Sequence, residues 1–137
     1  MPAYWLVKSE PETYGFADLR RDGRTVWDGV RNNAAALHLK AMRMGDEALF
    51  YHSGENRAVV GVAKVAREAF PDASDPAGRF VAVELAFDRS LDRPVTLAQM
   101  KAEPALAGMA MIRQGRLSVS PVTADEWAAV RRLSGDA

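Results

Sequence analysis

The sequence predicts an α+β protein, with short helices placed around a compact sheet or barrel. Its 137 residues have the size of one ordinary domain. Hydrophobic residues make up 48% and charged residues 26% of the chain, a composition typical of a globular protein with a real core. Strand-like and helix-like segments alternate without a regular βαβ rhythm, which favours the α+β class. We expect residues 1–137 to form a single domain.

The first third of the chain predicts one strand and two helices. Residues 4–8 form a short apolar run suited to a buried strand. Residues 16–21 fit a short helix that an Asp-Gly pair would end. Asn32 and Asn33 can each cap a second helix, which is expected to reach about residue 44.

Three strands are expected in the middle of the chain, at residues 47–52, 58–66 and 80–88. The last is the clearest, because large apolar residues alternate there with alanine and glutamate. Residues 71–78 (PDASDPAG) are rich in turn formers and predict a surface loop.

The C-terminal third predicts a short strand followed by a capped helix. Residues 116–119 are expected to be extended, with their polar side chains alternating. Before them, Thr96 can cap a short helix. Thr123 and Glu126 have the spacing of a capping box, and Gly135 would end the helix that they begin.

The charge balance argues against a general polyanion-coating protein. Eighteen basic and eighteen acidic residues give a net charge of zero, whereas non-specific nucleic-acid binding depends on many neutralised phosphates. The cations are unevenly distributed, because residues 20–43 hold six basic side chains against two acidic ones. The chain therefore predicts at most a local basic surface.

Composition also bears on the compartment. The chain has no cysteine, so disulfides, thiolate metal sites and cysteine nucleophiles are excluded. No apolar run approaches the roughly 18 residues of a membrane span, and the N-terminal ten residues lack a signal-peptide pattern. We expect a cytoplasmic protein that does not bind a membrane.

Standard catalytic and cofactor motifs are not found in the sequence. No glycine run has the spacing of a phosphate-binding loop. His38 and His52 have no partners at metal-ligand spacing, so neither a metal nor a cofactor is expected. The His52-Ser53 pair lacks the context of a nucleophile elbow. The sequence therefore favours a binding protein over an enzyme.

Polar residues cluster where apolar runs end, at residues 8–11, 27–32, 52–54 and 116–119. Each cluster alone is compatible with a turn, a cap or a strand edge. Together they supply aromatic faces, short hydroxyl and amide groups, and cations. A pocket for a planar polar ligand needs this combination.

Five segments in order resemble the EVE domain family: YWLVKSEP (4–11), WDGVRN (27–32), GDEALFYHS (45–53), GVAKV (61–65) and RLSVSPVT (116–123). The resemblance covers nearly the whole chain. It implies a PUA-like fold, a mixed β-barrel of about five to six strands surrounded by short α-helices. It also implies a non-enzymatic reader that binds a modified base in DNA or RNA, with modified cytosine as the favoured ligand.

The resemblance implies a base-binding set of nine residues: Lys8, Ser9, Trp27, Val30, Arg31, Asn32, Ser53, Arg116 and Ser118. In this set, Trp27 would stack on the base. Hydroxyl and amide groups of Ser9, Asn32 and Ser53 would read its edge. The cations of Lys8, Arg31 and Arg116 would hold flanking phosphates.

The chain departs from the family pattern at two places. Residues 33–36 read Asn-Ala-Ala-Ala where family members usually have a Gln-Ala-Arg run. Ser120 stands where glutamine is common. Both changes shorten polar groups near the expected pocket, which leaves the identity of the ligand open.

Two other classes of function remain open from the sequence. One is an enzyme that acts on RNA or on a nucleotide, with Lys8, Glu10 and His52 as candidate catalytic groups. The other is a module that binds a small metabolite or a protein partner through the same pocket.

Overall fold

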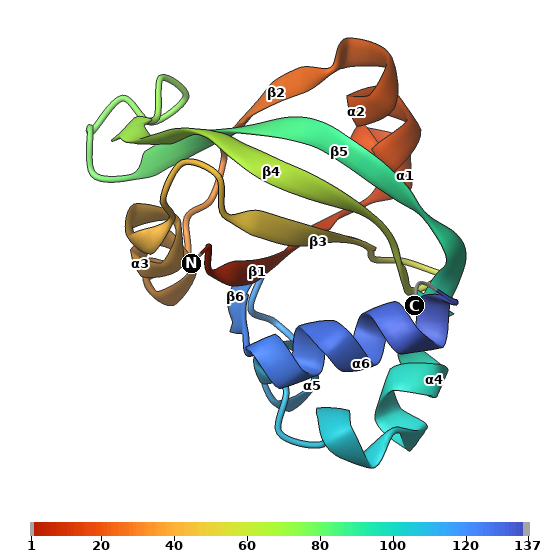
Figure 1. Ribbon diagram of the computed structural model, residues 1–137. Coiled ribbons are helices and arrows are strands. Elements are labelled where there is room, and N and C mark those ends of the chain that lie inside the picture. The colour runs from red at the N-terminus through yellow and green to blue at the C-terminus, as the bar shows by residue number, and fades with distance from the viewer. Residues whose placement is uncertain (1, 136–137) are drawn as a thin grey trace.

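The fold is a six-stranded mixed sheet with short helices on both of its faces (Figure 1). A computed structural model describes residues 2–135. The strands are β1 (Tyr4–Ser9), β2 (Arg24–Trp27), β3 (Glu47–His52), β4 (Ala58–Pro71), β5 (Val81–Thr96) and β6 (Val119–Val122). Their order across the sheet is β2-β5-β4-β3-β1-β6. The α+β prediction is confirmed.

Among the described residues, six α-helices and one 3₁₀ turn lie between the strands or after the last one. They are α1 (Pro11–Tyr14), α2 (Phe16–Asp22), α3 (Asn33–Ala41), α4 (Leu97–Ala102), η1 (Pro104–Leu106), α5 (Ala110–Arg113) and α6 (Ala124–Ser134). Figure 1 shows α6 crossing below the sheet, with α4 beneath it. Within residues 2–135, no helix combines the length and the apolar character needed to cross a membrane.

Strand β1 joins distant parts of the chain. It runs parallel to β3, with Lys8 opposite Tyr51, and antiparallel to β6, with Leu6 opposite Ser120. Its side chains alternate between two hydrophobic cores, because Val7 belongs to the cluster that includes Phe16, and Leu6 belongs to the cluster under α6. A strand buried on both faces reads as a continuous apolar run, as residues 4–7 do.

The predicted helix caps are confirmed. The Asn32 side chain accepts a hydrogen bond of 2.9 Å from the Ala35 amide and begins α3. The Thr123 hydroxyl accepts from the Glu126 amide at 3.1 Å, and the Glu126 carboxylate accepts from the Thr123 amide at 2.9 Å. This reciprocal pair is a capping box. Thr96 begins α4 in the same way.

Several elements differ from the prediction. Strands β4 and β5 extend well beyond 58–66 and 80–88, because register shifts let the two strands stay paired. Strand β2 is not predicted from the sequence, since its four residues form an edge strand with mixed polarity. Helix α3 ends at Ala41 rather than near residue 44. The buried Asp46 carboxylate accepts the Arg43 amide at 2.9 Å, which ends the helical hydrogen bonding.

The last strand begins later than predicted. The pattern at residues 116–119 predicts an extended segment, but β6 starts at Val119. A turn precedes it, in which the Leu117 amide donates to the Gln114 carbonyl. Ser120 is fully buried in β6, and it does not line the pocket described below. The departure from the family pattern at Ser120 therefore affects a buried strand.

Gly61 lies in β4 directly under the ring of Phe16. A Cβ atom at Gly61 would lie 2.1 Å from the Phe16 ring. That ring is itself enclosed by Phe50 and Phe87, at 5.2 and 5.4 Å between centroids. The site cannot accept a methyl group without displacing the core.

We expect Gly61→Ala to lower the free energy of unfolding by roughly 3 kcal/mol, the cost of overpacking a core. Urea denaturation would measure the change. Gly108→Ala is the matched control, because nothing lies within 4 Å of the added Cβ. Equal stabilities of the two variants would contradict this account of the packing.

Candidate functional site

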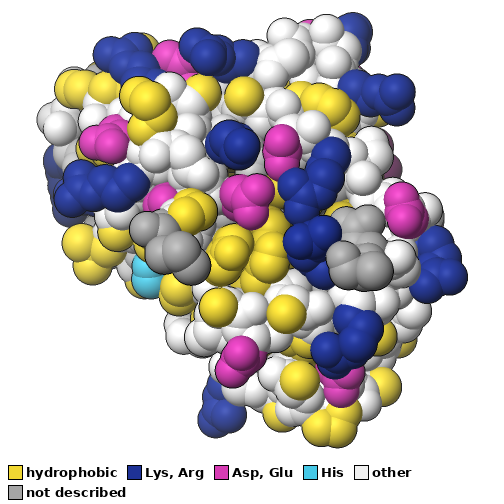
Figure 2. Space-filling model, viewed as in Figure 1, with side chains coloured by type: hydrophobic (Ala, Val, Ile, Leu, Met, Phe, Trp, Pro, Cys, Tyr) yellow, Lys and Arg dark blue, Asp and Glu magenta, His cyan; other side chains and the backbone are white. Residues whose placement is uncertain are grey.

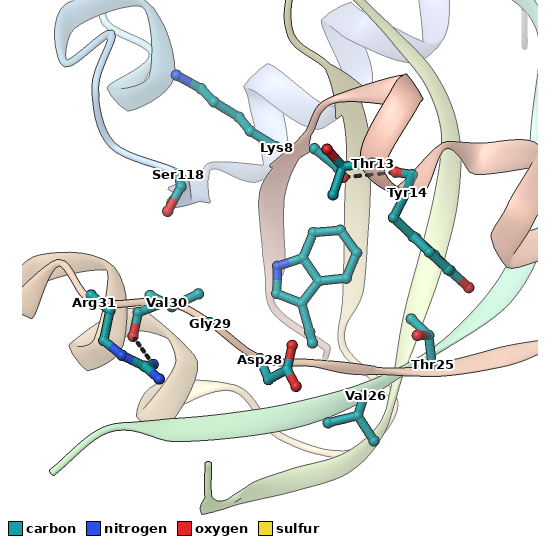
Figure 3. Close-up of a pocket in the computed structure, with 12 residues that line it drawn as sticks. Lys8, Thr13, Tyr14, Thr25, Val26, Asp28, Gly29, Val30, Arg31 and Ser118 are labelled. Carbon is teal, nitrogen blue, oxygen red and sulfur yellow. Dashed lines mark hydrogen bonds between the residues drawn. The ribbon is translucent and has the colours of Figure 1, made fainter. Parts of the chain in front are cut away.

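A pocket of about 450 Å³ opens beside the C-terminal end of β1. Figure 3 shows its lining residues. They are Lys8, Ser9, Thr13, Tyr14, Thr25, Val26, Trp27, Asp28, Gly29, Val30, Arg31 and Ser118. The structure thus brings together the ends of β1 and β2 with the turn before β6. These three places carry the first, second and last of the five segments quoted above.

Lys8 and Ser118 form the wall nearest β6. The Lys8 amide donates to the Ser118 carbonyl at 3.0 Å, and the Lys8 ammonium donates to the Gly115 carbonyl at 2.7 Å. Figure 3 shows the Lys8 side chain extending away from the pocket centre. Burial lowers the pKa of Lys8, so an anion beside its ammonium would favour the charged form.

Ser9 and Tyr14 form the opposite wall. The Ser9 hydroxyl donates to the Tyr14 carbonyl at 2.7 Å, which leaves its oxygen as an acceptor. The Tyr14 hydroxyl donates to the Asp22 carboxylate at 2.9 Å. Burial raises the pKa of Tyr14, so its phenol is neutral at physiological pH.

Trp27 contributes to the pocket from within the core. Only 8% of its surface is exposed. The rings of Phe50 and Tyr14 meet it in edge-on geometry, at 5.5 and 6.5 Å between centroids. Stacking of a base on Trp27 therefore stays a prediction, and most of the indole surface is already covered by these neighbours.

The buried carboxylate of Asp72 fixes the third wall. It accepts from the Gly29 amide at 2.9 Å and from the Arg31 guanidinium at 3.0 Å. Its other oxygen accepts from the amide and the hydroxyl of Ser74, at 2.7 and 2.6 Å. Burial alone would raise the pKa of Asp72, but the hydrogen bonds donated by Ser74, Gly29 and Arg31 outweigh it and hold this pKa well below its usual range.

Arg31 is consequently engaged within the protein. Its guanidinium contacts Asp72 and the Ser74 hydroxyl, the latter at 3.0 Å, and lies 5.3 Å from the centre of the Phe80 ring. Figure 3 shows the head group turned away from the pocket centre. The carboxylate compensates its charge, which weakens the case for Arg31 as a phosphate ligand.

Asp28 and Ser118 are two polar groups that the pocket leaves available. Both line it, and neither side chain has a hydrogen-bond partner within residues 2–135. Asp28 is exposed. The sequence places it inside the WDGVRN segment, although the predicted site set does not include it. An acidic residue beside a buried tryptophan is the signal that could have identified it.

Three predicted site residues lie outside this pocket. The Asn32 side chain caps α3, and Arg116 is exposed in the turn before β6. Ser53 lies across β1, where its amide donates to the Ser9 carbonyl at 3.0 Å. Binding of a base by these residues stays a prediction. Ser53 lines a different hollow, which it shares with Lys8.

The candidate catalytic groups Glu10 and His52 lie outside the lining of this pocket, whereas Lys8 is part of it. His52 Nε2 accepts a hydrogen bond from the Phe16 amide at 3.0 Å, so it holds the start of α2. Burial lowers the pKa of His52. Glu10 is exposed at the start of α1. The described residues contain no group of three or more His, Cys, Asp or Glu that could hold a metal.

Comparison with known proteins identifies the family. The EVE domain model matches residues 3–133. The chain belongs to the EVE domain family. Human thymocyte nuclear protein 1 is 32% identical over 161 residues, which covers 93% of this chain and 72% of the relative. The mouse protein of the same name is 34% identical and covers 90% of this chain and 70% of the relative. The family resemblance is confirmed.

Solved structures agree with this EVE domain. A protein from Rhodopseudomonas palustris is 50% identical, with a TM-score of 0.92, over 97% of this chain and 93% of that chain. Human THYN1 in complex with 5-methylcytosine containing DNA is 32% identical, with a TM-score of 0.90, over 96% of this chain and 97% of that chain. An ASCH protein from Zymomonas mobilis, 13% identical with a TM-score of 0.59, shares the fold.

We expect Asp72→Asn to lower the free energy of unfolding of this EVE domain at pH 7 by about 2–3 kcal/mol, because buried donors lose their acceptor. The pKa of Asp72 is lower in the folded than in the unfolded state. Its carboxylate therefore stabilises the fold above about pH 4 and loses this effect as the pH falls further. Denaturation at several pH values should show the two proteins converging in acid.

Asp28→Asn is the control for this experiment. Asp28 is exposed and has no internal hydrogen bond among the described residues, so its replacement should change stability by less than about 0.5 kcal/mol. A stability gap between wild type and Asp72→Asn that stays constant from pH 7 to pH 2 would contradict the assigned role.

Proposed function

We propose that this EVE domain is a non-enzymatic reader that holds a modified cytosine of DNA in the pocket beside β1 and β2. The main observation behind this proposal is that three segments typical of the family meet at this one pocket. The complex of human THYN1 with 5-methylcytosine containing DNA supports the choice of ligand. RNA carrying the same modified base is the second polymer to test.

The pocket has a size that suits one base. Its volume of about 450 Å³ lies within the usual range for small-ligand sites, about 300–1,000 Å³. A base in a duplex must leave the stack to enter such a pocket, at a cost of a few kcal/mol. Contacts to the base in the pocket and to the neighbouring phosphates must together return at least that amount.

The available polar groups match the edge of cytosine. The exocyclic amine of cytosine is a donor, and a carboxylate is a natural acceptor for it. Asp28 supplies a carboxylate without an internal partner among the described residues. Ser118 supplies a hydroxyl that can donate to a ring acceptor of the base. Thymine has a carbonyl in place of the amine, so Asp28 would disfavour it.

The pocket also offers an apolar surface for a methyl group. Val26 lines it and is 48% exposed, although it is a large hydrophobic residue. Burial of one methyl group contributes roughly 0.8 kcal/mol, or about fourfold in affinity. A larger preference for a methylated base would require close fit as well as burial.

The decisive experiment is a fluorescence titration at one salt concentration. It compares oligonucleotides of one sequence with cytosine, 5-methylcytosine or 5-hydroxymethylcytosine, as single and double strands of DNA and RNA. We expect at least a tenfold preference for one modified form, equal to about 1.4 kcal/mol. Equal affinities for all forms would overturn the proposal, and equal affinity for a free nucleoside would favour a metabolite-binding module.

Asp28→Ala should weaken binding to DNA with 5-methylcytosine and reduce its preference over DNA with thymine at the same position. The carboxylate accepts from the exocyclic amine, which all the cytosine forms carry and thymine lacks. The titration described above, with a thymine oligonucleotide added, measures both effects. Asp92→Ala, which removes an exposed carboxylate of β5 outside the pocket, should leave the preference intact. An unchanged preference in Asp28→Ala would contradict its assigned role.

A further inference from the structure

A second hollow, of about 350 Å³, lies across β1 from the base pocket. Its lining includes three cations, Lys8, Arg57 and Lys101, together with Tyr51 and Ser53. We call it the basic hollow. Lys8 lines both cavities, so the end of β1 separates them. Two contacts stabilise this end of β1 between the cavities: Lys8 pairs with Tyr51 of β3, and the Ser53 amide donates to the Ser9 carbonyl.

The basic hollow concentrates positive charge that the chain does not neutralise. Among the described residues, its lining contains no carboxylate. Arg57 and Lys101 are exposed, and neither forms an ion pair within residues 2–135. Glu55 lines an adjoining hollow that Arg57 and Lys101 also border.

This arrangement differs from the face of the molecule that Figure 2 presents. Figure 2 shows Lys and Arg side chains scattered among Asp and Glu on the face that it presents. Several arginines are paired, such as Arg31 with Asp72 and Arg132 with Glu103. Three cations around one cavity, in a chain with a net charge of zero, therefore mark a site for an anion.

The remaining lining fits a phosphate attached to a sugar. The Ser53 hydroxyl can donate to a phosphate oxygen. Burial raises the pKa of Tyr51, so its phenol stays protonated and can also donate. Leu97, Met111 and Ile112 add apolar surface to the same cavity, which suits a sugar better than a fully hydrated ion.

We propose that the basic hollow binds a phosphodiester group of the nucleotide next to the one whose base enters the pocket. The proposal rests on the proposed function and extends it, because one strand would pass over the end of β1 and place a base on one side and a phosphate on the other. Neither Arg57 nor Lys101 belongs to the five segments that identify the family.

The test uses the double variant Arg57→Gln, Lys101→Gln in the same oligonucleotide titration, repeated at several salt concentrations. We expect at least a tenfold loss of affinity for single-stranded DNA. The slope of log affinity against log salt should fall by about 0.7 for each phosphate that the variant no longer neutralises. The ratio between modified and unmodified DNA should stay unchanged, because the base pocket is intact.

The control is Lys40→Gln, Lys64→Gln, which removes the same charge from two exposed lysines that line neither cavity. Equal losses in the two double variants would overturn the proposal, since net charge would then explain the effect. The phosphate proposal would also be overturned if the Arg57→Gln, Lys101→Gln variant had the salt slope of the wild type. If the wild type still preferred modified cytosine, the reader function would stand.

The converse outcome separates the two proposals in the other direction. The wild type could show no preference among the cytosine forms while the Arg57→Gln, Lys101→Gln variant loses affinity and salt dependence. This result would support the phosphate site and contradict the reader function. The last measurement is a titration of the protein with inorganic phosphate. Binding of free phosphate in the basic hollow as tight as that of the oligonucleotide would overturn the assignment to a phosphodiester.

Discussion

The double pairing of β1 is the constraint on which the rest of this structure depends. The strand lies between β3 and β6 and contributes side chains to both hydrophobic cores. A slip of one residue would exchange Val7 with Leu6 between the two cores, so the register is strongly fixed. The same register places Lys8 and Ser9 at the end of the strand, between the base pocket and the basic hollow.

Local signals make much of the fold predictable. The helix caps at Asn32, Thr96 and Thr123 depend on side chains within three residues of the cap, so spacing alone reveals them. The apolar run at residues 4–7 likewise identifies a strand buried on both faces. The long strands β4 and β5 are underestimated, because their register shifts arise from pairing and leave no local pattern.

The site is predictable only in part, for the same reason. Six of the nine expected residues line one pocket, and their binding of a base stays a prediction; they are Lys8, Ser9, Trp27, Val30, Arg31 and Ser118. The partner of Arg31 could not be foreseen, because Asp72 lies 41 residues away in a turn-forming segment. Asn32 has a second role that spacing also predicts, since the side chain expected to read a base begins α3 through its oxygen.

The pairing of β1 with β6 also limits how early during synthesis the protein can complete its fold. Val7 lies opposite Val119, so the two strands are separated by more than a hundred residues of chain. On the ribosome, at about 5–20 residues per second, β1 waits several seconds for its second neighbour. Pairings of such high sequence separation form slowly. The wall that joins Lys8 to Ser118 is therefore among the last parts to assemble, and a nascent chain without β6 has no complete pocket.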